Sequence, residues 1–399
     1  MPPKDKRILI TILFSIFITV LGVGIVVPLL PVYAHTLGAS GFMISMIFGS
    51  LSISRTLFLP YFGKRSDKEG RKPFIVAGLF SYFLVAIGFI ISSSVHALII
   101  NRFFQGIAAA MIMPITQAYV ADITPQGKEG RLMGIYNMAI LGSLSLGPVF
   151  GGVINEHWGL GASFACMAGL SLVGFFLSIF FLPPVTEEVI QKVHSGERGW
   201  RFLLKDPMID GIAAIRFAYV MCIGMIWCFL PVYADTEFFL SSSSIGILVM
   251  LGVLVSGLIQ YPMGYLADRF NKNIMIVSGC GLIFIAMNLF VWARGFMDLF
   301  FINILFGLGG GICMPPVMAI AVIKGQAYKT MGSVMSLMTM AHSMGMLAGA
   351  LLGGIIMDKD AIRHAFPIGA LAILAGGIIF ISCLIRDNKK RKAEDTRSF

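Results

Sequence analysis

Long apolar runs, separated by short polar stretches, extend through nearly the whole chain of 399 residues. Each run is close to the ~20 residues that an α-helix needs to cross a bilayer. The pattern therefore predicts an all-α membrane protein with twelve transmembrane helices. Their expected ranges are 8–34, 42–62, 73–93, 97–120, 132–154, 160–182, 208–233, 243–264, 274–293, 297–322, 331–356 and 361–385.

An internal repeat divides these spans into two sets of six. The string LPVYAH at 30–35 returns as LPVYAD at 230–235, and further matches keep an offset of 200–202 residues. Repeats with an even number of spans keep the same orientation, as in two bundles related by an axis along the membrane normal. We expect two pseudo-symmetric six-helix bundles, residues 1–182 and 207–399, joined by a cytoplasmic linker at 183–206.

Composition and charge agree with a membrane protein. Hydrophobic residues make up 57% of the chain and charged residues 13%, against about a quarter in soluble domains. With the N-terminus inside, the inward segments hold 24 of the 30 Lys and Arg residues. This positive-inside bias predicts that both termini are cytoplasmic, and it accounts for the net charge of +10 without a nucleic-acid partner. The six cysteines all lie in predicted spans without paired spacing, so neither disulfides nor a thiolate metal site is expected.

A charged segment between the second and third spans, Gly63–Lys72 (GKRSDKEGRK), has a weaker copy at Gly264–Asn273. We expect Gly63 to end a helix and allow close approach to a neighbour, and Asp67 to accept hydrogen bonds at the start of a nearby helix. Arg71 can pair with Asp122. An alternative is that these residues only contribute to the positive-inside bias.

Three stretches give the chain its resemblance to the major facilitator superfamily. Gly63–Lys72 resembles the loop between helices 2 and 3 of that family, although Lys64, Arg65 and Ser66 replace its usual small or apolar residues. The stretch NRFFQGIAAA at 101–110 resembles the helix 4 motif of the family. The stretch GSLSLGPVFGG at 142–152 resembles the helix 5 signature of its antiporters. The matching residues are Gly63, Asp67, Gly70, Arg71 and Lys72; Arg102, Gln105 and Gly106; and Gly142, Gly147, Pro148, Gly151 and Gly152.

The resemblance implies a twelve-span bacterial drug:proton antiporter in the cytoplasmic (inner) membrane. It implies proton-coupled efflux of small amphiphilic compounds by alternating access, with helices 1, 4, 7 and 10 lining a central cavity. It also implies that Asp67, Arg71 and Asp122 latch the cytoplasmic gate in the outward-open state, with Gly264, Asp268 and Arg269 as the second-half counterpart. Exchange or facilitated transport of an organic anion, and substrate uptake, are the alternatives.

The helix 5 motif also has a direct physical interpretation. Glycines four residues apart, such as Gly147 and Gly151, form a smooth face for tight helix packing, and Pro148 removes a backbone donor and bends the helix. Helix 11 offers Gly345 and Gly349 at the same spacing. Tight packing alone and a hinge for a rocking motion both fit this pattern.

Charged and polar residues inside the spans are the candidates for cavity and coupling roles, because such residues are costly in a membrane. They are Arg55, Arg102, Arg216 and His342, with Gln105, Gln117 and Met113 as further lining residues. Snorkelling is the alternative for Arg55 and Arg216, and a lone histidine such as His342 is more often a satisfied interior group.

Within the predicted spans Asp and Glu occur only at the helix ends, at Asp210 and Asp298, so the deeply embedded carboxylate common in drug:proton antiporters is missing. A cation about 6 Å from a cavity arginine would meet nearly 3 kcal/mol of repulsion at an effective dielectric of about 20. We therefore predict a preference for neutral or anionic amphiphiles over quaternary ammonium compounds, with Arg102 as the arginine facing the cavity. Proton coupling would then run through His342, Asp122 or arginine-linked water, or be absent.

Other classes of protein are disfavoured. No grouping of nucleophile and base, no P-loop and no zinc-ligand spacing occurs, so neither an enzyme nor a metal site is expected, and no cofactor. A receptor role would be favoured by extra soluble domains. The expected partners are an amphiphilic small molecule, the lipid bilayer and, as an option, the proton, and the chain is expected to act as a monomer.

Overall fold

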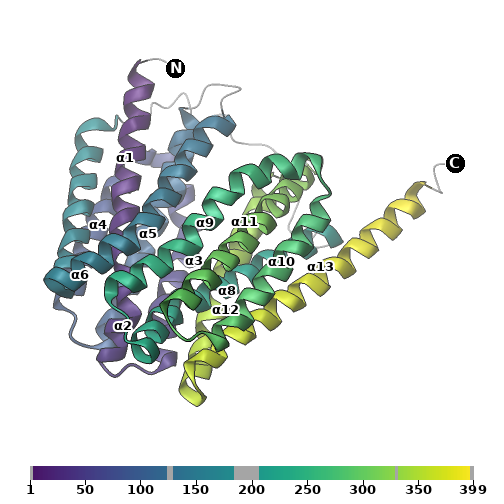
Figure 1. Ribbon diagram of the computed structural model, residues 1–399. Helices are drawn as coiled ribbons and strands as arrows, with labels where there is room; N and C mark the ends of the chain where they lie inside the picture. Colours follow the sequence, from purple (N-terminus) through teal and green to yellow (C-terminus); the bar gives the residue numbers. More distant parts are fainter. Residues whose placement is uncertain (1–2, 124–128, 184–205, 329–330, 396–399) are drawn as a thin grey trace. The chain divides into compact units, whose positions relative to one another are not determined.

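The computed structural model describes residues 3–123, 129–183, 206–328 and 331–395, and all regular structure in these ranges is helical (Figure 1). The helices of the first half are α1 (Pro3–Val26), α2 (Leu29–Thr36), α3 (Gly41–Glu69), α4 (Arg71–Ile91), α5 (Val95–Asp122) and α6 (Glu129–Phe181). Those of the second half are α8 (Pro207–Phe238), α9 (Ser242–Arg269), α10 (Lys272–Leu289), α11 (Phe296–Ala327), α12 (Met331–Lys359) and α13 (Phe366–Asp395). Short 3-10 segments, η2 (Phe290–Trp292) and η3 (Ile362–Ala365), follow α10 and precede α13.

Eleven segments of the described chain are long and apolar enough to cross a membrane. One of them, Met138–Phe181, has 44 residues, and a straight helix of that length would be about 66 Å long, twice the hydrocarbon thickness of a bilayer. The backbone leaves the helical region at Gly159, where φ is 80° and ψ is 171°. Since only glycine adopts this conformation readily, the segment is two spans joined at Gly159. The predicted count of twelve spans is therefore confirmed.

The chain forms two compact units. Unit 1 comprises residues 1–194 and 227–254, and unit 2 comprises residues 195–226 and 255–399. In unit 1, α1 packs on α6, α3 on α5, and α4 on both α5 and α6. Small residues allow these helices to pack closely. A methyl group added to Gly106 of α5 would lie only 1.9 Å from the Ser54 hydroxyl oxygen of α3, so a larger residue would push the two helices apart. The Asn101 side-chain amide adds a polar tie by donating to the Val85 carbonyl of α4 at 2.8 Å.

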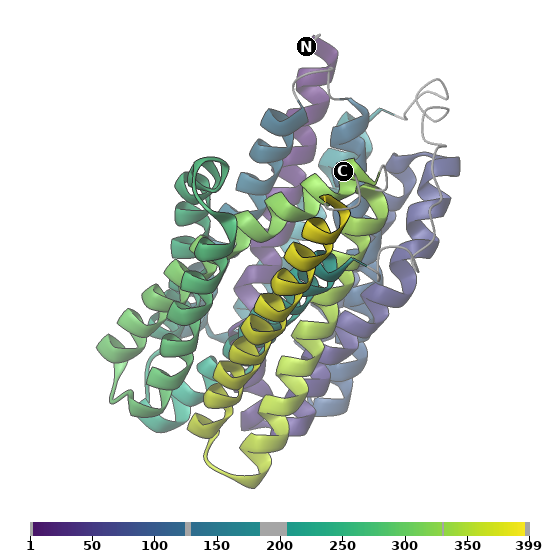
Figure 2. The ribbon, with the colours of Figure 1, turned by 90° about the vertical axis from the view of Figure 1, so that its right-hand side faces the viewer.

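In unit 2, α10 packs against α11 and α13, and α11 packs against α12. Helix α13 is a single long helix that continues to residue 395, as its yellow ribbon shows in Figure 2. Helix α12 lies directly on the first part of α8. The backbones are so close that methyl groups added to Gly345 and Gly349 would lie 2.4 and 2.0 Å from the carbonyl oxygens of Phe217 and Met221. The glycine spacing identified in helix 11 thus produces tight packing.

The charged segment Gly63–Lys72 differs from the predicted loop. Helix α3 continues to Glu69, α4 begins at Arg71, and Gly70, at φ 89°, is the single residue between them. The interpretation of Gly63 as a helix end with a close neighbour is wrong: Gly63 lies within α3, and nothing lies within 4 Å of a methyl group placed on it. Its counterpart Gly264 lies within α9 in equally open space.

Candidate functional site

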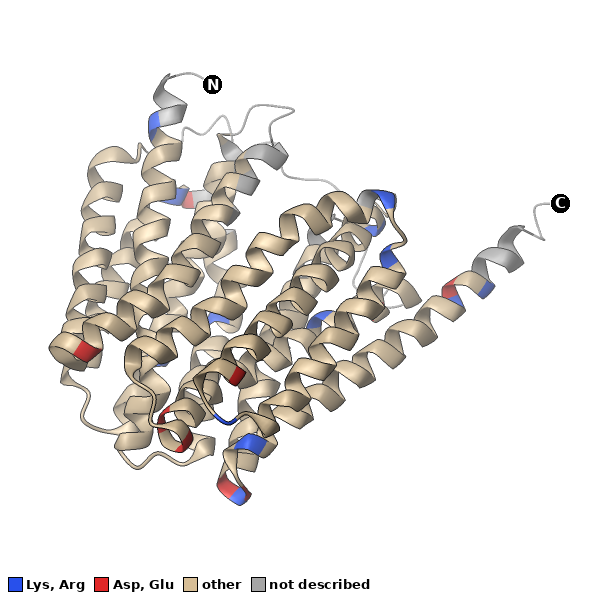
Figure 3. Cartoon of the chain, in the orientation of Figure 1, with Lys and Arg blue, Asp and Glu red and all other residues tan. Residues whose placement is uncertain are grey.

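Charged residues are concentrated at helix ends and connections, while the middles of the helices are almost free of them (Figure 3). The exceptions are the intramembrane arginines. Arg102 of α5 is only 2% exposed, and its guanidinium carbon lies 5.0 Å from the centre of the Phe48 ring and 6.0 Å from that of Phe89. Its Nη1 donates to Gln105 Oε1 at 2.7 Å. Nε and Nη2 of Arg102 have no hydrogen-bond partner among the described residues.

The aromatic rings partly replace hydration for this buried cation, since a guanidinium is attracted to the face of an aromatic ring. Arg102 is enclosed by protein on all sides in this conformation. The expectation that it is the arginine that faces the cavity is therefore wrong for this conformation. Nor do the other candidates on α5 join it: Gln117 is exposed and Met113 is partly buried, and Gln117 lies about 22 Å further along the helix axis. Arg55, on α3, is partly buried.

Arg216 and His342 form the second intramembrane cluster, within unit 2. Nη2 of Arg216 lies 3.3 Å from His342 Nδ1, and Nη1 donates to the sulfur of Met314 at 3.4 Å. Both side chains are partly exposed. No carboxylate of the described chain forms an ion pair with Arg216, and its Nε has no hydrogen-bond partner there. The structure thus brings together two of the predicted residues, although they are 126 positions apart in the chain.

The contact between α8 and α12 explains why these two side chains meet. Gly345 and Gly349 allow the backbones to touch, and His342 precedes Gly345 by one helical turn on α12. Because residues three apart lie on the same face of a helix, His342 faces α8, where Arg216 precedes Phe217. Met314 of α11 completes the cluster from a third helix.

The glycines of the helix 5 motif place α6 between two other helices of unit 1. A methyl group on Gly147 would lie 2.6 Å from the Cα of Gly24 in α1, and one on Gly151 would lie 2.1 Å from the Ile25 carbonyl oxygen. On the other side, a methyl group on Gly152 would lie 2.3 Å from the Ser242 carbonyl oxygen at the start of α9. The motif therefore holds α1 and α9 against α6, whereas Gly142 makes only an ordinary contact with the Phe17 ring.

Polar contacts extend this junction beyond the glycines. Asn155 Nδ2 donates to Ser242 Oγ at 2.8 Å, and the Ser243 backbone N–H donates to the Glu156 carboxylate at 3.2 Å. A carboxylate is favourable at this end of α9, because a helix N-terminus carries partial positive charge. A mostly apolar cavity of about 150 Å³ lies beside the junction, between α2, α6 and α9. That volume is smaller than the roughly 300–1,000 Å³ of sites for drug-sized ligands, so this cavity is not the substrate site.

The residues of the predicted latch are only partly described. Arg71 Nη1 donates to Ser66 Oγ at 2.9 Å, and Lys72 Nζ donates to the Ile179 carbonyl oxygen near the end of α6 at 2.8 Å. Lys72 thereby ties the start of α4 to the end of α6. The side chains of Asp67, Asp122 and Asp268 lie outside the described residues. Arg269, of the second-half copy, has its guanidinium 4.4 Å from the centre of the Tyr265 ring.

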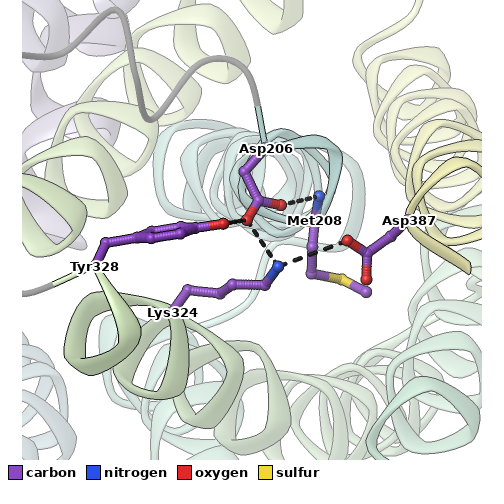
Figure 4. Close-up of polar contacts among 5 residues, drawn as sticks. All are labelled: Asp206, Met208, Lys324, Tyr328 and Asp387. Atoms are coloured by element: carbon purple, nitrogen blue, oxygen red, sulfur yellow. Dashed lines mark hydrogen bonds and ion pairs between the residues drawn. The ribbon is translucent and has the colours of Figure 1, made fainter. Parts of the chain in front are cut away.

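A cluster that the sequence analysis missed joins three helices of unit 2 (Figure 4). Asp206 caps α8, accepting a hydrogen bond from the Met208 backbone N–H at 2.8 Å. Its other oxygen accepts bonds from Lys324 Nζ at 2.7 Å and from the Tyr328 hydroxyl. Lys324 also lies 3.6 Å from Asp387 of α13. Asp206 and Asp387 are each 6% exposed, so the start of α8, the end of α11 and the last third of α13 are joined by largely buried charges.

The electrostatics of Asp206 follow from these contacts. Burial alone raises the pKa of its carboxyl, but the hydrogen bonds from Lys324 and Tyr328 and the charge of Lys324 outweigh burial and hold the pKa below its usual value. The sequence contained one sign of this cluster, because a carboxylate is a common capping group at the start of a helix. Asp206 before Pro207 is also the usual start of a helix, with a capping residue followed by proline.

Within the described residues, no group of three or more His, Cys, Asp or Glu side chains could hold a metal ion. Twelve membrane spans that pack through glycines, with arginines held among them, are typical of multi-pass transport proteins. The chain belongs to the Major Facilitator Superfamily, whose sequence profile matches residues 12–324 and, in an overlapping second match, residues 212–398. This family consists of transporters and not of enzymes.

Individual relatives cover almost the whole chain. An uncharacterised transporter of the family from Methanocaldococcus jannaschii is 29% identical over 381 residues, which are 94% of this chain and 98% of the relative. Multidrug resistance protein 2 of Bacillus subtilis is 26% identical over 385 residues, 94% of either chain. Among solved structures, an inward-facing, unoccupied bacterial homologue of the human lysosomal transporter Spinster has a TM-score of 0.76 at 11% identity and covers 96% of both chains. The predicted fold class, twelve helices in two pseudo-symmetric six-helix bundles, is confirmed.

Proposed function

We propose that this transporter exports small amphiphilic compounds from the cell in exchange for protons, by alternating access. It acts as a monomer in the cytoplasmic membrane, with both termini inside and two bundles, 1–182 and 207–399, joined by the linker 183–206. The observation that carries the proposal is the placement of the helix 5 motif, which resembles that of antiporters, at a close junction of α1, α6 and α9. The relation to a multidrug resistance protein of Bacillus subtilis supports it.

Alternating access requires one closure on each side of the membrane. On the outward side, as assigned by the positive-inside bias, the junction of Gly152, Asn155 and Glu156 with the start of α9 provides the closure. On the cytoplasmic side, the segment Gly63–Lys72 and Asp122 provide it when the cavity faces outward. In this scheme Lys72 holds the segment in place through its bond to α6.

The preference of this transporter is for neutral or anionic substrates over quaternary ammonium compounds. The arginine that would repel a cationic substrate is Arg216, because Arg216 is partly exposed while Arg102 is enclosed by protein. A cation about 6 Å from Arg216 would meet nearly 3 kcal/mol of repulsion at an effective dielectric of about 20, which is roughly a hundredfold in affinity.

Exchange or facilitated transport of an organic anion is the second candidate function. It is favoured by one observation: no described carboxylate forms an ion pair with Arg216, so the positive charge is available to an anion. Uptake of such an anion belongs to the same class.

Transport into inverted membrane vesicles, with and without a proton gradient, tests these proposals. The probes are ethidium, a neutral amphiphilic dye and a carboxylated dye of similar size. Export coupled to protons predicts gradient-dependent accumulation of the neutral or carboxylated dye and weak accumulation of ethidium. Accumulation that ignores the gradient would favour the exchanger. Strong ethidium accumulation that is the same in Arg216→Ala would overturn the charge preference.

A further inference from the structure

One edge of the Arg102 guanidinium consists of donors without acceptors. Nη1 donates to Gln105 Oε1 at 2.7 Å, whereas Nε and Nη2 have no hydrogen-bond partner among the described residues. These two nitrogens share one edge of the planar group, and their parallel N–H bonds form the fork that receives an anion in bidentate pairs. The amide Nε2 of Gln105 also lacks a partner there. Arg102 is 2% exposed and Gln105 0%, so bulk water does not reach these donors.

A second arginine adds positive charge to this region of unit 1. Arg55 of α3 and Arg102 both interact electrostatically with the Tyr82 hydroxyl of α4. The Cys228 thiol of α8 also interacts with Arg102, and both the phenol and the thiol are neutral at physiological pH. Within the described chain no carboxylate forms an ion pair with either arginine. The region therefore combines two cations with no described anion.

The surroundings of Arg102 compensate only part of its charge. The rings of Phe48 and Phe89 attract the guanidinium, but an aromatic ring carries no net negative charge. A buried cation without a counter-ion is strongly destabilising. A suitable partner for Nε and Nη2 accepts two hydrogen bonds, carries negative charge and is small enough for an enclosed position. Water meets the size requirement, but it adds no negative charge and brings two donors of its own that need acceptors.

We propose that Arg102 and Gln105 form an internal binding site for a small monovalent inorganic anion of the size of chloride. The anion accepts from Nε and Nη2 of Arg102, and Gln105 holds the guanidinium in the required orientation through Nη1. Arg55 adds a second positive charge to the field at the site. A drug-sized amphiphile does not fit at an enclosed arginine, so the site is separate from the substrate cavity. The inference goes beyond the proposed function and does not rest on what the chain transports.

Binding of radioactive chloride to the full-length protein in detergent tests the site, with detergent alone as the blank. We expect saturable binding of one chloride per chain, competition by bromide and no competition by gluconate, which is too large. An anion that binds only the folded state stabilises that state by mass action. Raising chloride to a hundredfold above its dissociation constant should therefore raise the melting temperature by roughly 3–5 °C. Chloride replaces gluconate in this titration, so that the ionic strength stays constant.

Variants identify the groups. Arg102→Met removes the charge and both donors of the edge, so it should lose chloride binding. Gln105→Glu keeps the shape of the side chain but places a carboxylate beside the guanidinium, so this variant carries its own anion. Without chloride it should melt above the wild type, and added chloride should no longer raise its melting temperature. Arg294→Gln, which removes an exposed arginine, is the matched control and should behave as wild type. If Arg102→Met does not fold, the wild type and Gln105→Glu decide the matter.

Absence of saturable chloride binding would overturn the inference and leave water as the partner of the Arg102 edge. Chloride binding that is unchanged in either Arg102→Met or Gln105→Glu would overturn it as well, because the anion would then lie elsewhere. Since no gradient or vesicle is involved, these results do not depend on whether the chain exports dyes. Conversely, failure of dye export in vesicles would remove the proposed function and leave the anion site standing.

Discussion

Replacing Gly152 by alanine should open the junction between α6 and α9 selectively. The added methyl group would lie 2.3 Å from the Ser242 carbonyl oxygen, so the start of α9 must move by about 1 Å, and overpacking of this kind costs roughly 1–3 kcal/mol. If α6 and α9 separate when the transporter opens outward, only the closed state bears this cost. The population should then shift toward outward-open by about 5- to 150-fold.

The assay is labelling of a cysteine introduced at Ile245, which lines the small cavity beside the junction and is 3% exposed. A membrane-impermeant maleimide should label it faster in Gly152→Ala than in the parent. Gly151→Ala is the matched control, because its methyl group would meet α1 at 2.1 Å instead of α9. It should lower thermal stability without faster labelling, and Gly161→Ala, with open space around it, should change neither. Equal labelling in the Gly151 and Gly152 variants would refute the reasoning.

Three further predictions concern the ends of the helices. Lys324→Met should lower stability by about 3 kcal/mol, because it leaves the largely buried Asp206 without its cation, and chemical or thermal unfolding in detergent measures this loss. The pKa of Asp206 is lower in the folded than in the unfolded protein, so its carboxylate contributes stability that is fully present above the unfolded pKa of about 3.9 and is lost as the pH falls through the folded pKa. The stability difference between wild type and Asp206→Asn should therefore shrink below about pH 4. A difference that stays constant with pH would contradict this assignment. Asp67→Asn should shift the population toward inward-open by weakening the cytoplasmic latch, and unchanged labelling of cavity cysteines would remove Asp67 from that role.

Sequence patterns were most informative where one physical requirement dominates. The length of the apolar runs determined the number of spans, and the glycine spacing predicted the packing of α6 and of α12. The sequence could not show that Gly63–Lys72 is helical except at Gly70, because its charges resemble those of a loop and the helices extend beyond the apolar region. It also could not show which arginine is enclosed, since this depends on the rings of Phe48 and Phe89 from other helices.

The candidate site shows the same limit. Arg216 and His342 were each identifiable as costly residues in a membrane, but nothing in the sequence paired them across 126 positions. The cluster of Asp206, Lys324 and Asp387 was missed because residues beyond the apolar runs were assigned only to the cytoplasmic linker and the other inward segments. The start of α8, the end of α11 and the last third of α13 meet in the fold, so their charges are buried together and are not solvated individually.

The turn at Gly159 has a consequence for biosynthesis. The arms of α6 are separated by a single non-helical residue, so no independent loop exists for the membrane-insertion machinery to move across after the first arm has settled. We therefore expect the two arms to enter the bilayer together as a helical hairpin. In the orientation proposed above, with both termini inside, the apolar residues of both arms would jointly compensate the cost of moving Asn155 and Glu156 across the membrane. The polar residues that meet α9 thus reach their side of the membrane as part of the hairpin, before α9 itself has been synthesised.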